Sequence, residues 1–216
     1  MSTSITKQGI IFADGESIGE NILTGTGINS YKSGDAAHVN TNAASTWAGA
    51  SGGNGVFTVV EDFSVPVGMY SWNITDNTSG NRDYQQGQQP FIANTTYTAS
   101  WWAKGDGISM LRVWNATDGK AMFTYKVHLT ETWDYYTYTF TATEEYESDS
   151  CSFLLGCTGI ANISICGMKL EKGSTPTPWT PNPNDAIYTG EHGFFEGNDI
   201  ASIGKGYVSG REFYEM

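Results

Sequence analysis

Residues 94–143 read NTTYTASWWAKGDG, ISMLRVWNATDGKAMFTYKVHL and TETWDYYTYTFTAT in succession, and this stretch decides the fold. It is rich in Thr, Val, Tyr, Phe and Trp, which favour half-buried strands, and Gly, Asp or Asn bounds each piece. Residues 105–107 (Gly-Asp-Gly) and the pair Asp118-Gly119 predict turns between three strands, the second a tight hairpin. No segment of similar length has the i, i+3, i+4, i+7 stripe of a helix, so the sequence predicts an all-β chain.

Side chains alternate between two faces along each of these strands. One face is apolar and suits a core; it carries Tyr97, Ala99, Trp101, Ala103, Leu111, Val113, Tyr136, Tyr138 and Phe140. The other face is polar except for Met110 and for single large aromatics, which are Trp102, Trp114 and Tyr135. An aromatic ring among polar groups indicates a binding surface. Arg112 alternates with Trp114 on this face, and two roles stay open for it: hydrogen bonds to a ligand, or support of Trp114 by stacking.

The composition sets limits on size and on partners. A chain of 216 residues with 39% hydrophobic and 13% aromatic content can bury a core of its own and still keep rings for a surface. Its net charge of −12 argues against nucleic acid and against an anionic membrane as partner, because phosphates are bound by clustered Lys and Arg. Neutral sugars are compatible with this charge.

The N-terminus lacks the basic and apolar regions of a signal peptide, and the chain has no apolar run long enough to span a bilayer, so we expect a soluble product made in the cytoplasm. Cys151, Cys157 and Cys166 lie in apolar sequence away from the three His residues. An odd number of Cys without CxxC spacing predicts small buried hydrophobes rather than a metal or redox site.

The chain divides into three predicted parts: a strand-like arm at 1–20, a sandwich domain at 21–183 and a C-terminal segment at 184–216. Residues 201–215 repeat the order of Ser-Ile, Lys, Gly and Glu found in the arm. Each copy predicts a strand-turn-strand unit that is too small to be stable alone. We therefore predict a homo-oligomer, with a trimer favoured; the alternative is a monomer whose ends fold back on the sandwich.

Two further segments carry expectations about the surface. Residues 77–89, which read NTSGNRDYQQGQQ, predict a polar loop that holds one aromatic, Tyr84. Four prolines follow Glu171 and bar both a helix and a central strand, so this segment should lie extended with Trp179 as its anchor.

The sequence also resembles a known family. YTASWWAKGDG, TWDYYTYTFTAT and ISICGMKLEKGSTPTPWTPNP are similar to the jelly-roll carbohydrate-binding modules of the family four, nine and twenty-two type, in the version found in phage tail and baseplate proteins. The most specific part is MKLEKGSTPTPWTPNP, and the resemblance covers most of 21–183. It implies a two-sheet antiparallel β-sandwich, or jelly roll, flanked by short β-rich ends.

The resemblance implies sugar binding, and the residue types agree with it. Sugar rings pack their C–H faces on aromatic rings, while their hydroxyls need fixed donors and acceptors. In such modules an aromatic in the loop before the YTASWWAKG strand often contributes, and Tyr84, beside Arg82, is the match here. The predicted carbohydrate-binding residues are Tyr84, Trp102, Trp114, Arg112, Gln86, Asp83 and Tyr135.

Enzyme-attached relatives commonly carry a structural calcium held by an acidic residue in the last strand. Here Gly167 and Met168 stand where that residue is expected, which argues against calcium, although Asp35 or Asp62 could supply oxygen ligands. No other cofactor is predicted.

The resemblance implies a non-catalytic carbohydrate-binding protein of the phage tail, carried in the virion, that aids adsorption to a bacterial surface glycan and contacts other tail proteins. Two alternatives remain: a purely structural tail or baseplate protein that decorates or bridges subunits, and a glycan-cleaving enzyme. The enzyme is disfavoured because the acidic run at 144–149 lies on one turn, whereas glycosidases hold two carboxylates about 5–10 Å apart across a cleft.

Overall fold

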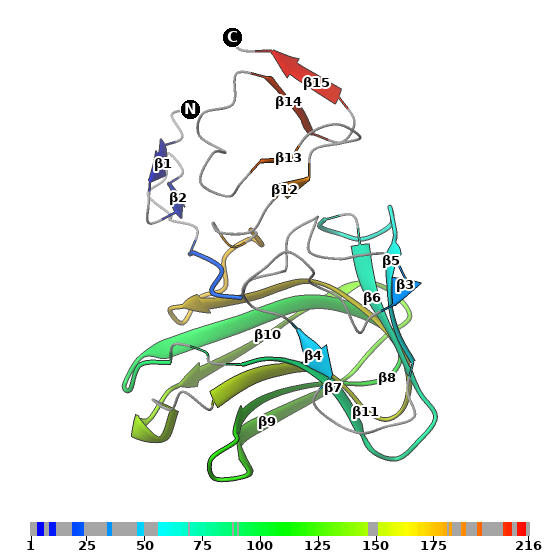
Figure 1. The fold of residues 1–216 in the computed structure, drawn as a ribbon, viewed down its shortest axis with the longest axis vertical. Helices are drawn as coiled ribbons and strands as arrows, with labels where there is room; N and C mark the ends of the chain where they lie inside the picture. The colour runs from blue at the N-terminus through cyan, green and yellow to red at the C-terminus, as the bar shows by residue number, and fades with distance from the viewer. Residues whose placement is uncertain are drawn as a thin grey trace.

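The structure is a computed structural model of the chain, and its fold is drawn in Figure 1. It describes residues 4–6, 9–11, 19–23, 34–35, 47–49, 56–68, 70–87, 89, 91–146, 151–180, 182, 187–188, 194–195, 205–208 and 211–214. Among these residues the only helix is a short 3-10 turn, η2 (Glu144–Tyr146), at the start of the predicted acidic turn. No helix in this part of the chain is long and apolar enough to cross a membrane.

Nine hydrogen-bonded strands form the body of the molecule, as the all-β prediction required. They are β3 (Gly34–Asp35), β4 (Ala48–Gly49), β5 (Val56–Glu61), β6 (Tyr70–Asp76), β7 (Asn81–Gln86), β8 (Thr96–Asn115), β9 (Lys120–His128), β10 (Asp134–Thr141) and β11 (Cys151–Lys172). Every pairing is antiparallel.

The nine strands make two layers because β8 and β11 pass through both (Figure 1). In the upper sheet the order is β10, the first half of β8, the second half of β11, β6, β5 and β3. In the lower sheet it is β9, the second half of β8, the first half of β11, β7 and β4. The fold is therefore the predicted two-sheet antiparallel sandwich.

The bends in β8 and β11 lie at glycines. Gly105 and Gly107 in β8 have φ values of 126° and 136°, and Gly159 in β11 has φ 73°. These conformations strain residues with a Cβ, and a Cβ on Gly105 would lie 2.2 Å from the Asn162 carbonyl oxygen. The predicted turn at 105–107 is thus wrong: one strand continues through it and changes sheet. In the same way β11 continues through its bend at Gly159 as one strand and changes sheet. The hairpin at Asp118-Gly119 is confirmed, with Gly119 at φ 64°.

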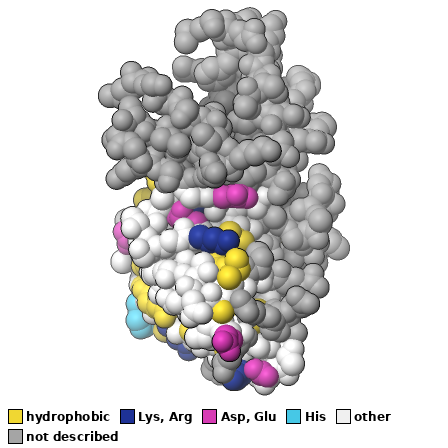
Figure 2. Space-filling view, turned by 90° about the vertical axis from the view of Figure 1, so that its left-hand side faces the viewer, with side chains coloured by type: hydrophobic (Ala, Val, Ile, Leu, Met, Phe, Trp, Pro, Cys, Tyr) yellow, Lys and Arg dark blue, Asp and Glu magenta, His cyan; other side chains and the backbone are white. Residues whose placement is uncertain are grey.

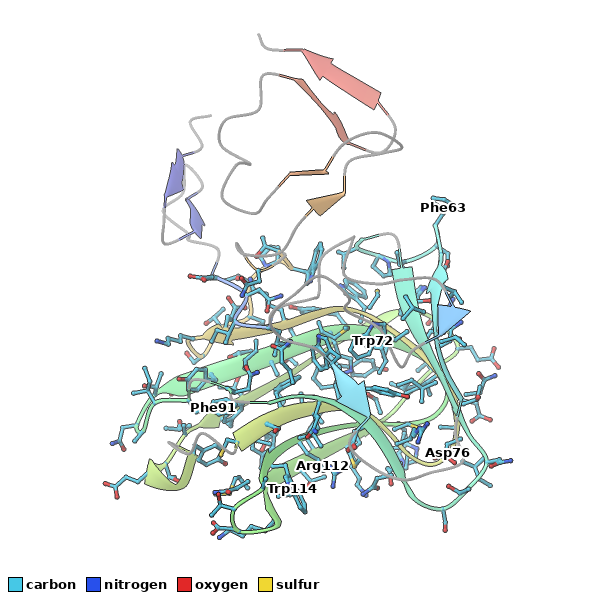
Figure 3. The ribbon with its side chains drawn as sticks, in the orientation of Figure 1. Phe63, Trp72, Asp76, Phe91, Arg112 and Trp114 are labelled. Carbon is cyan, nitrogen blue, oxygen red and sulfur yellow. The ribbon has the colours of Figure 1, made fainter. Side chains whose placement is uncertain are left out.

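Aromatic residues fill the space between the sheets. Trp72 lies at the centre (Figure 3), with its ring centroid 4.8 Å from that of Trp47 and 6.1 Å from that of Tyr84. At the β9–β10 side, Tyr125 and Tyr138 close the sandwich with centroids 4.6 Å apart. The predicted core residues Trp101, Tyr136, Tyr138 and Phe140 all belong to this cluster or pack against it.

The three cysteines are buried free thiols, as predicted. Burial raises the pKa of Cys157 and of Cys166 to about 12, so both thiols stay protonated at neutral pH.

The chain enters and leaves the sandwich side by side along the second half of β11, where the Ile22 N–H donates to the Leu170 carbonyl. Asn21 donates from Nδ2 to the carbonyls of Met168 and Thr180, each at 3.0 Å, and Asn182 donates to the Asn21 carbonyl at 2.7 Å. Next to them Lys169 donates from Nζ to Thr177 Oγ1 at 2.6 Å and to the Pro178 carbonyl at 2.9 Å. We call this set of contacts the clasp. It fixes the predicted extended segment against β11.

Outside the sandwich, three two-stranded units are present, drawn above the upper sheet in Figure 1. They pair β1 (Ser4–Thr6) with β2 (Gly9–Ile11), β12 (Ile187–Tyr188) with β13 (Phe194–Phe195), and β14 (Lys205–Val208) with β15 (Arg211–Tyr214). The first and last of these are the strand-turn-strand units that the sequence predicted. The predicted domain limits at 20 and 183 remain predictions.

Charged side chains are scattered over the face drawn in Figure 2. Lys, Arg, Asp and Glu lie singly among uncharged atoms there, without a patch of one sign on the part of the face that is described. The described part of this face therefore lacks the cluster of Lys and Arg that binds phosphates.

Candidate functional site

An arginine, a carboxylate and an indole come together on the outer face of the lower sheet. Arg112 of β8 donates from Nε to Asp83 Oδ2 of β7 at 2.9 Å, and its Nη2 forms an ion pair with the same oxygen. The Asp83 side chain is fully buried, whereas the Arg112 side chain keeps 12% exposure. The guanidinium carbon lies 5.5 Å from the centre of the Trp114 ring. Figure 3 shows Arg112 and Trp114 next to each other. We call Asp83, Arg112 and Trp114 the Arg112 surface.

The local sequence explains how these side chains meet. Arg112 and Trp114 are two apart in β8, so they share a face. Arg112 has to reach across β11 to meet Asp83, and the strand between them carries Gly156, which pairs with both Met110 and Asp83. A Cβ at Gly156 would lie 2.0 Å from the Arg82 carbonyl oxygen and 2.5 Å from Asp83 Cα. Glycine therefore permits the close approach of β7 on which the ion pair depends.

The guanidinium has N–H groups beyond the two that bind Asp83. Within the described part of the chain no acceptor is found for them. A cation whose charge is matched by a buried carboxylate, and whose remaining donors lie beside an aromatic face, suits a neutral hydroxyl-bearing ligand rather than an anion. Both roles left open for Arg112 are thus compatible with the structure.

Two predicted binding residues lie elsewhere. The polar loop predicted at 77–89 is wrong over 81–86, which form β7 between β11 and β4. A strand paired on both sides turns alternate side chains to the core, so Tyr84 is only 5% exposed and Gln86 only 2%. Tyr84 packs on Trp72, and Gln86 Oε1 accepts from Gln89 Nε2 at 3.3 Å. Neither side chain joins the Arg112 surface.

The remaining pair, Trp102 and Tyr135, lies on the outer face of the upper sheet. The two residues are direct partners across β8 and β10, with ring centroids 5.1 Å apart. Tyr135 is 39% exposed and Trp102 is half-buried. The predicted residues thus fall on two opposite outer faces and in the core, and the single surface expected from the sequence is not formed.

Three residues that border the Arg112 surface were not predicted from the sequence. Gln85 of β7 is half-buried beside Leu154, and Thr124 of β9 is exposed and pairs directly with Arg112. Lys126 of β9 lies opposite Met110 and is an exposed cation at the margin. Strand alternation could have identified Gln85, because it lies two positions from Asp83 and so shares its face. Thr124 and Lys126 could be placed beside Arg112 only once the register of the β8–β9 hairpin was known.

The described residues do not fit a calcium ion. They include no group of three or more His, Cys, Asp or Glu that could hold a metal. At the expected position Gly167 has no side chain and Met168 is buried in the core. Asp62 Oδ1 already accepts from the Ser64 N–H at 2.8 Å and from its hydroxyl at 2.6 Å, and the Asp35 side chain lies outside the described residues. We therefore derive no role for calcium.

Comparison with known proteins gives neither a matching family model nor a matching curated protein. Among solved structures, the arabinose-bound α-L-arabinofuranosidase MgGH51 is similar with a TM-score of 0.56 at 16% identity, over 76% of this chain and 28% of that one. The enzymatically active domain of tailspike protein 4 of bacteriophage CBA120 is similar with a TM-score of 0.49 at 13% identity, over 71% of this chain and 21% of that one. TmCBM61 in complex with β-1,4-galactotriose is similar with a TM-score of 0.44 at 14% identity, over 71% of this chain and 99% of that one. This chain thus spans under a third of the first two, and the similarity shows its fold, a β-sandwich also found within a larger carbohydrate-active enzyme.

Proposed function

We propose that this protein is a non-catalytic carbohydrate-binding protein whose Arg112 surface holds a neutral glycan. One observation carries the proposal: an arginine with spare donors, fixed by a fully buried carboxylate, lies 5.5 Å from an indole on an outer sheet face. The indole supplies a face for the C–H side of a sugar ring, and the guanidinium supplies donors for its hydroxyls. Because Asp83 balances the charge of Arg112, the site has no strong preference for a carboxylate or phosphate.

The absence of a role in catalysis is part of the proposal. Glycosidases need two carboxylates that face each other across a sugar. Here the Asp83 carboxylate binds Arg112, and the Glu171 carboxylate accepts from Thr177 N at 2.7 Å and lies 3.3 Å from Lys169 Nζ. Both are engaged and both are buried, so neither is poised to act on a ligand.

The biological setting is proposed from the sequence resemblance alone. We propose that the protein is carried in a phage tail, where it helps the particle adsorb to a bacterial surface glycan beside other tail proteins. The segment MKLEKGSTPTPWTPNP supports this setting, since it carries the most specific part of the resemblance. The alternative is a structural tail protein without sugar binding, and a glycan array distinguishes it from a glycan-binding protein.

Binding should be lost when the Arg112 surface is altered. The probe is an array of neutral and acidic glycans that includes xylan, galactan, arabinan and bacterial wall polysaccharides. We expect neutral glycans to bind, and Trp114→Ala to weaken binding about tenfold or more, because stacking on an aromatic ring contributes about 1–3 kcal/mol. Arg112→Lys should also weaken binding, since a lysine keeps the charge but loses the planar donors.

Phe63→Ala is the matched control. Phe63 is an aromatic ring with 80% exposure at a loop far from Arg112 in Figure 3, so its removal should leave binding unchanged. Absence of binding to every glycan on the array would favour the structural alternative. A preference for acidic glycans would contradict the charge argument.

We further propose a homo-oligomer, with a trimer favoured, held partly by the chain ends. Each terminal unit has two short strands, β1–β2 or β14–β15, and an isolated two-stranded unit is marginally stable at best. Light scattering on the full chain should report an oligomer, and a truncated chain of residues 19–183, which keeps the clasp, should be monomeric. A monomeric full chain would refute this proposal.

A further inference from the structure

The outward row of β10 offers a second uncharged surface, on the opposite side of the sandwich from the Arg112 surface. Tyr135, Thr137, Thr139 and Thr141 alternate along this edge strand of the upper sheet, and all four are exposed. Trp102 lies beside Tyr135 on the neighbouring strand. We call these five residues the Tyr135 strip. None of them carries a charge at neutral pH.

The aromatic end of the strip is held in place from behind. Trp102 and Tyr135 have ring centroids 5.1 Å apart and planes tilted by 44°. Gly167 of β11 has φ 59°, and a Cβ there would lie 3.3 Å from Trp102 Cδ1, 3.8 Å from Trp179 Cγ and 2.4 Å from Val67. Glycine at this position leaves room for two indoles and a valine, which keep Trp102 against Tyr135. Trp102 and Tyr135 therefore form a fixed aromatic platform in which the Tyr135 ring is the more exposed of the two.

The rest of the strip presents hydroxyl groups. Thr139 lies 2.9 Å from Thr98, and Thr141 lies 3.1 Å from Thr96, hydroxyl to hydroxyl across the two strands. Thr98 already donates to the Gly173 carbonyl at 2.8 Å, so Thr139 donates to Thr98 and keeps its lone pairs to accept from a ligand. The Thr96–Thr141 pair keeps one donor and free lone pairs. From Tyr135 to Thr141 the row extends about 20 Å at 3.3 Å per residue, which suits an extended chain of sugars rather than one ring.

Tyr135 itself is kept as a donor. Burial raises the pKa of its phenol, and the charge of Glu171 adds to that rise. The hydroxyl therefore stays protonated at neutral pH and above.

We propose that the Tyr135 strip is a second glycan-binding surface, so that each chain holds two neutral glycan segments on opposite outer faces. This inference rests on the proposed function and extends it to a second site. The strip combines a half-exposed aromatic platform, a row of hydroxyls and no charge, which together fit a neutral polyhydroxylated chain and disfavour an anion. Two linked sites raise avidity by factors of order 10² to 10⁴ when both engage one polymer.

The test is isothermal titration calorimetry on the full chain. The probes are cellohexaose, xylohexaose, β-1,4-galactotriose and arabinohexaose. We expect two sites per chain for at least one probe, one site in Tyr135→Ala, one site in Trp114→Ala, and none in the double variant. Thr137→Val, which removes an exposed hydroxyl at nearly constant volume, should weaken the second site several-fold even if Tyr135→Ala proves unstable. Ile160→Ala, at an exposed bend of β11 outside both surfaces, is the control that should bind like the unaltered chain.

The outcomes separate this inference from the proposed function. One site per chain that Trp114→Ala removes and that Tyr135→Ala and Thr137→Val leave unchanged would overturn the second surface and keep the first. One site that responds only to Tyr135→Ala and Thr137→Val would support the strip and overturn the Arg112 surface. No heat with any probe would overturn both.

Discussion

Replacing Lys169 by methionine should lower the free energy of unfolding by about 3–5 kcal/mol, the cost of breaking one side of a buried ion pair. The Lys169 and Glu171 side chains have 0% and 1% exposure, and Nζ lies 3.3 Å from Glu171 Oε2. Methionine fills a similar volume but leaves the Glu171 charge buried without its cation. The same change removes the bonds from Nζ to Thr177 and Pro178, which hold the exit segment in the clasp.

Urea unfolding followed by tryptophan fluorescence would measure the loss. The double variant Lys169→Met/Glu171→Gln is the control, because the amide is uncharged and its oxygen can still accept from the Thr177 N–H that now binds Glu171. It should recover most of the stability. If the free energy of unfolding of Lys169→Met is within about 1 kcal/mol of that of the unaltered chain, the Lys169–Glu171 pair contributes little to stability and the prediction is wrong.

The same lysine predicts a pH dependence with a definite sign. Burial lowers the pKa of Lys169 below its ordinary value of 10.5, and the charge of Glu171 only partly restores it. The unfolded chain therefore binds this proton more tightly than the folded chain does. As the pH rises through the folded pKa towards 10.5, the cost of burying the charge disappears. The stability of the unaltered chain relative to Lys169→Met should thus increase over that range.

Gly156→Ala should destabilise the sandwich by about 3 kcal/mol and weaken glycan binding at the Arg112 surface. The added methyl carbon would lie 2.0 Å from the Arg82 carbonyl oxygen and 2.5 Å from Asp83 Cα, both in the backbone of β7. Backbone cannot turn aside as a flexible side chain can, so β7 has to move away from β11. Asp83 moves with it, and Arg112 loses the carboxylate that orients it.

Thermal unfolding and glycan binding would be measured on the same preparation. Gly119→Ala is an informative control: Gly119 has φ 64°, but nothing lies within 4 Å of its Cβ position. Its cost should be limited to backbone strain, about 1–2 kcal/mol, with binding unchanged. If Gly156→Ala binds glycan as well as Gly119→Ala does, the dependence of Arg112 on the position of β7 is refuted.

Local pattern determined much of this molecule. The alternation in residues 96–115 and 134–141 places Trp101, Tyr136 and Phe140 inside and Trp102 and Tyr135 outside, as the structure has them. The Asp118-Gly119 pair fixed the β8–β9 hairpin, because a turn with positive φ depends on neighbouring residues alone. The burial of the cysteines followed from their apolar surroundings.

Other features depend on partners that are distant in the chain. The sequence of β7 has no apolar alternation, and Tyr84 becomes a core residue only because β11 and β4 pair with both edges of that strand. Lys169 and Glu171 are charged residues, and they are buried because Thr177 and Pro178 bind them and Gly19 in turn binds Thr177.

Strand alternation by itself distinguishes inside from outside, and that is what the sequence of β8 determined for Trp102 and Trp114. Both have the outward parity, twelve positions apart in one strand, and on a flat sheet they would share a face. Only the tertiary structure decided that they point in opposite directions. The strand bends at Gly105 and Gly107 and passes from one sheet to the other, so its inner face stays inner throughout while its outer face becomes two opposite surfaces of the sandwich.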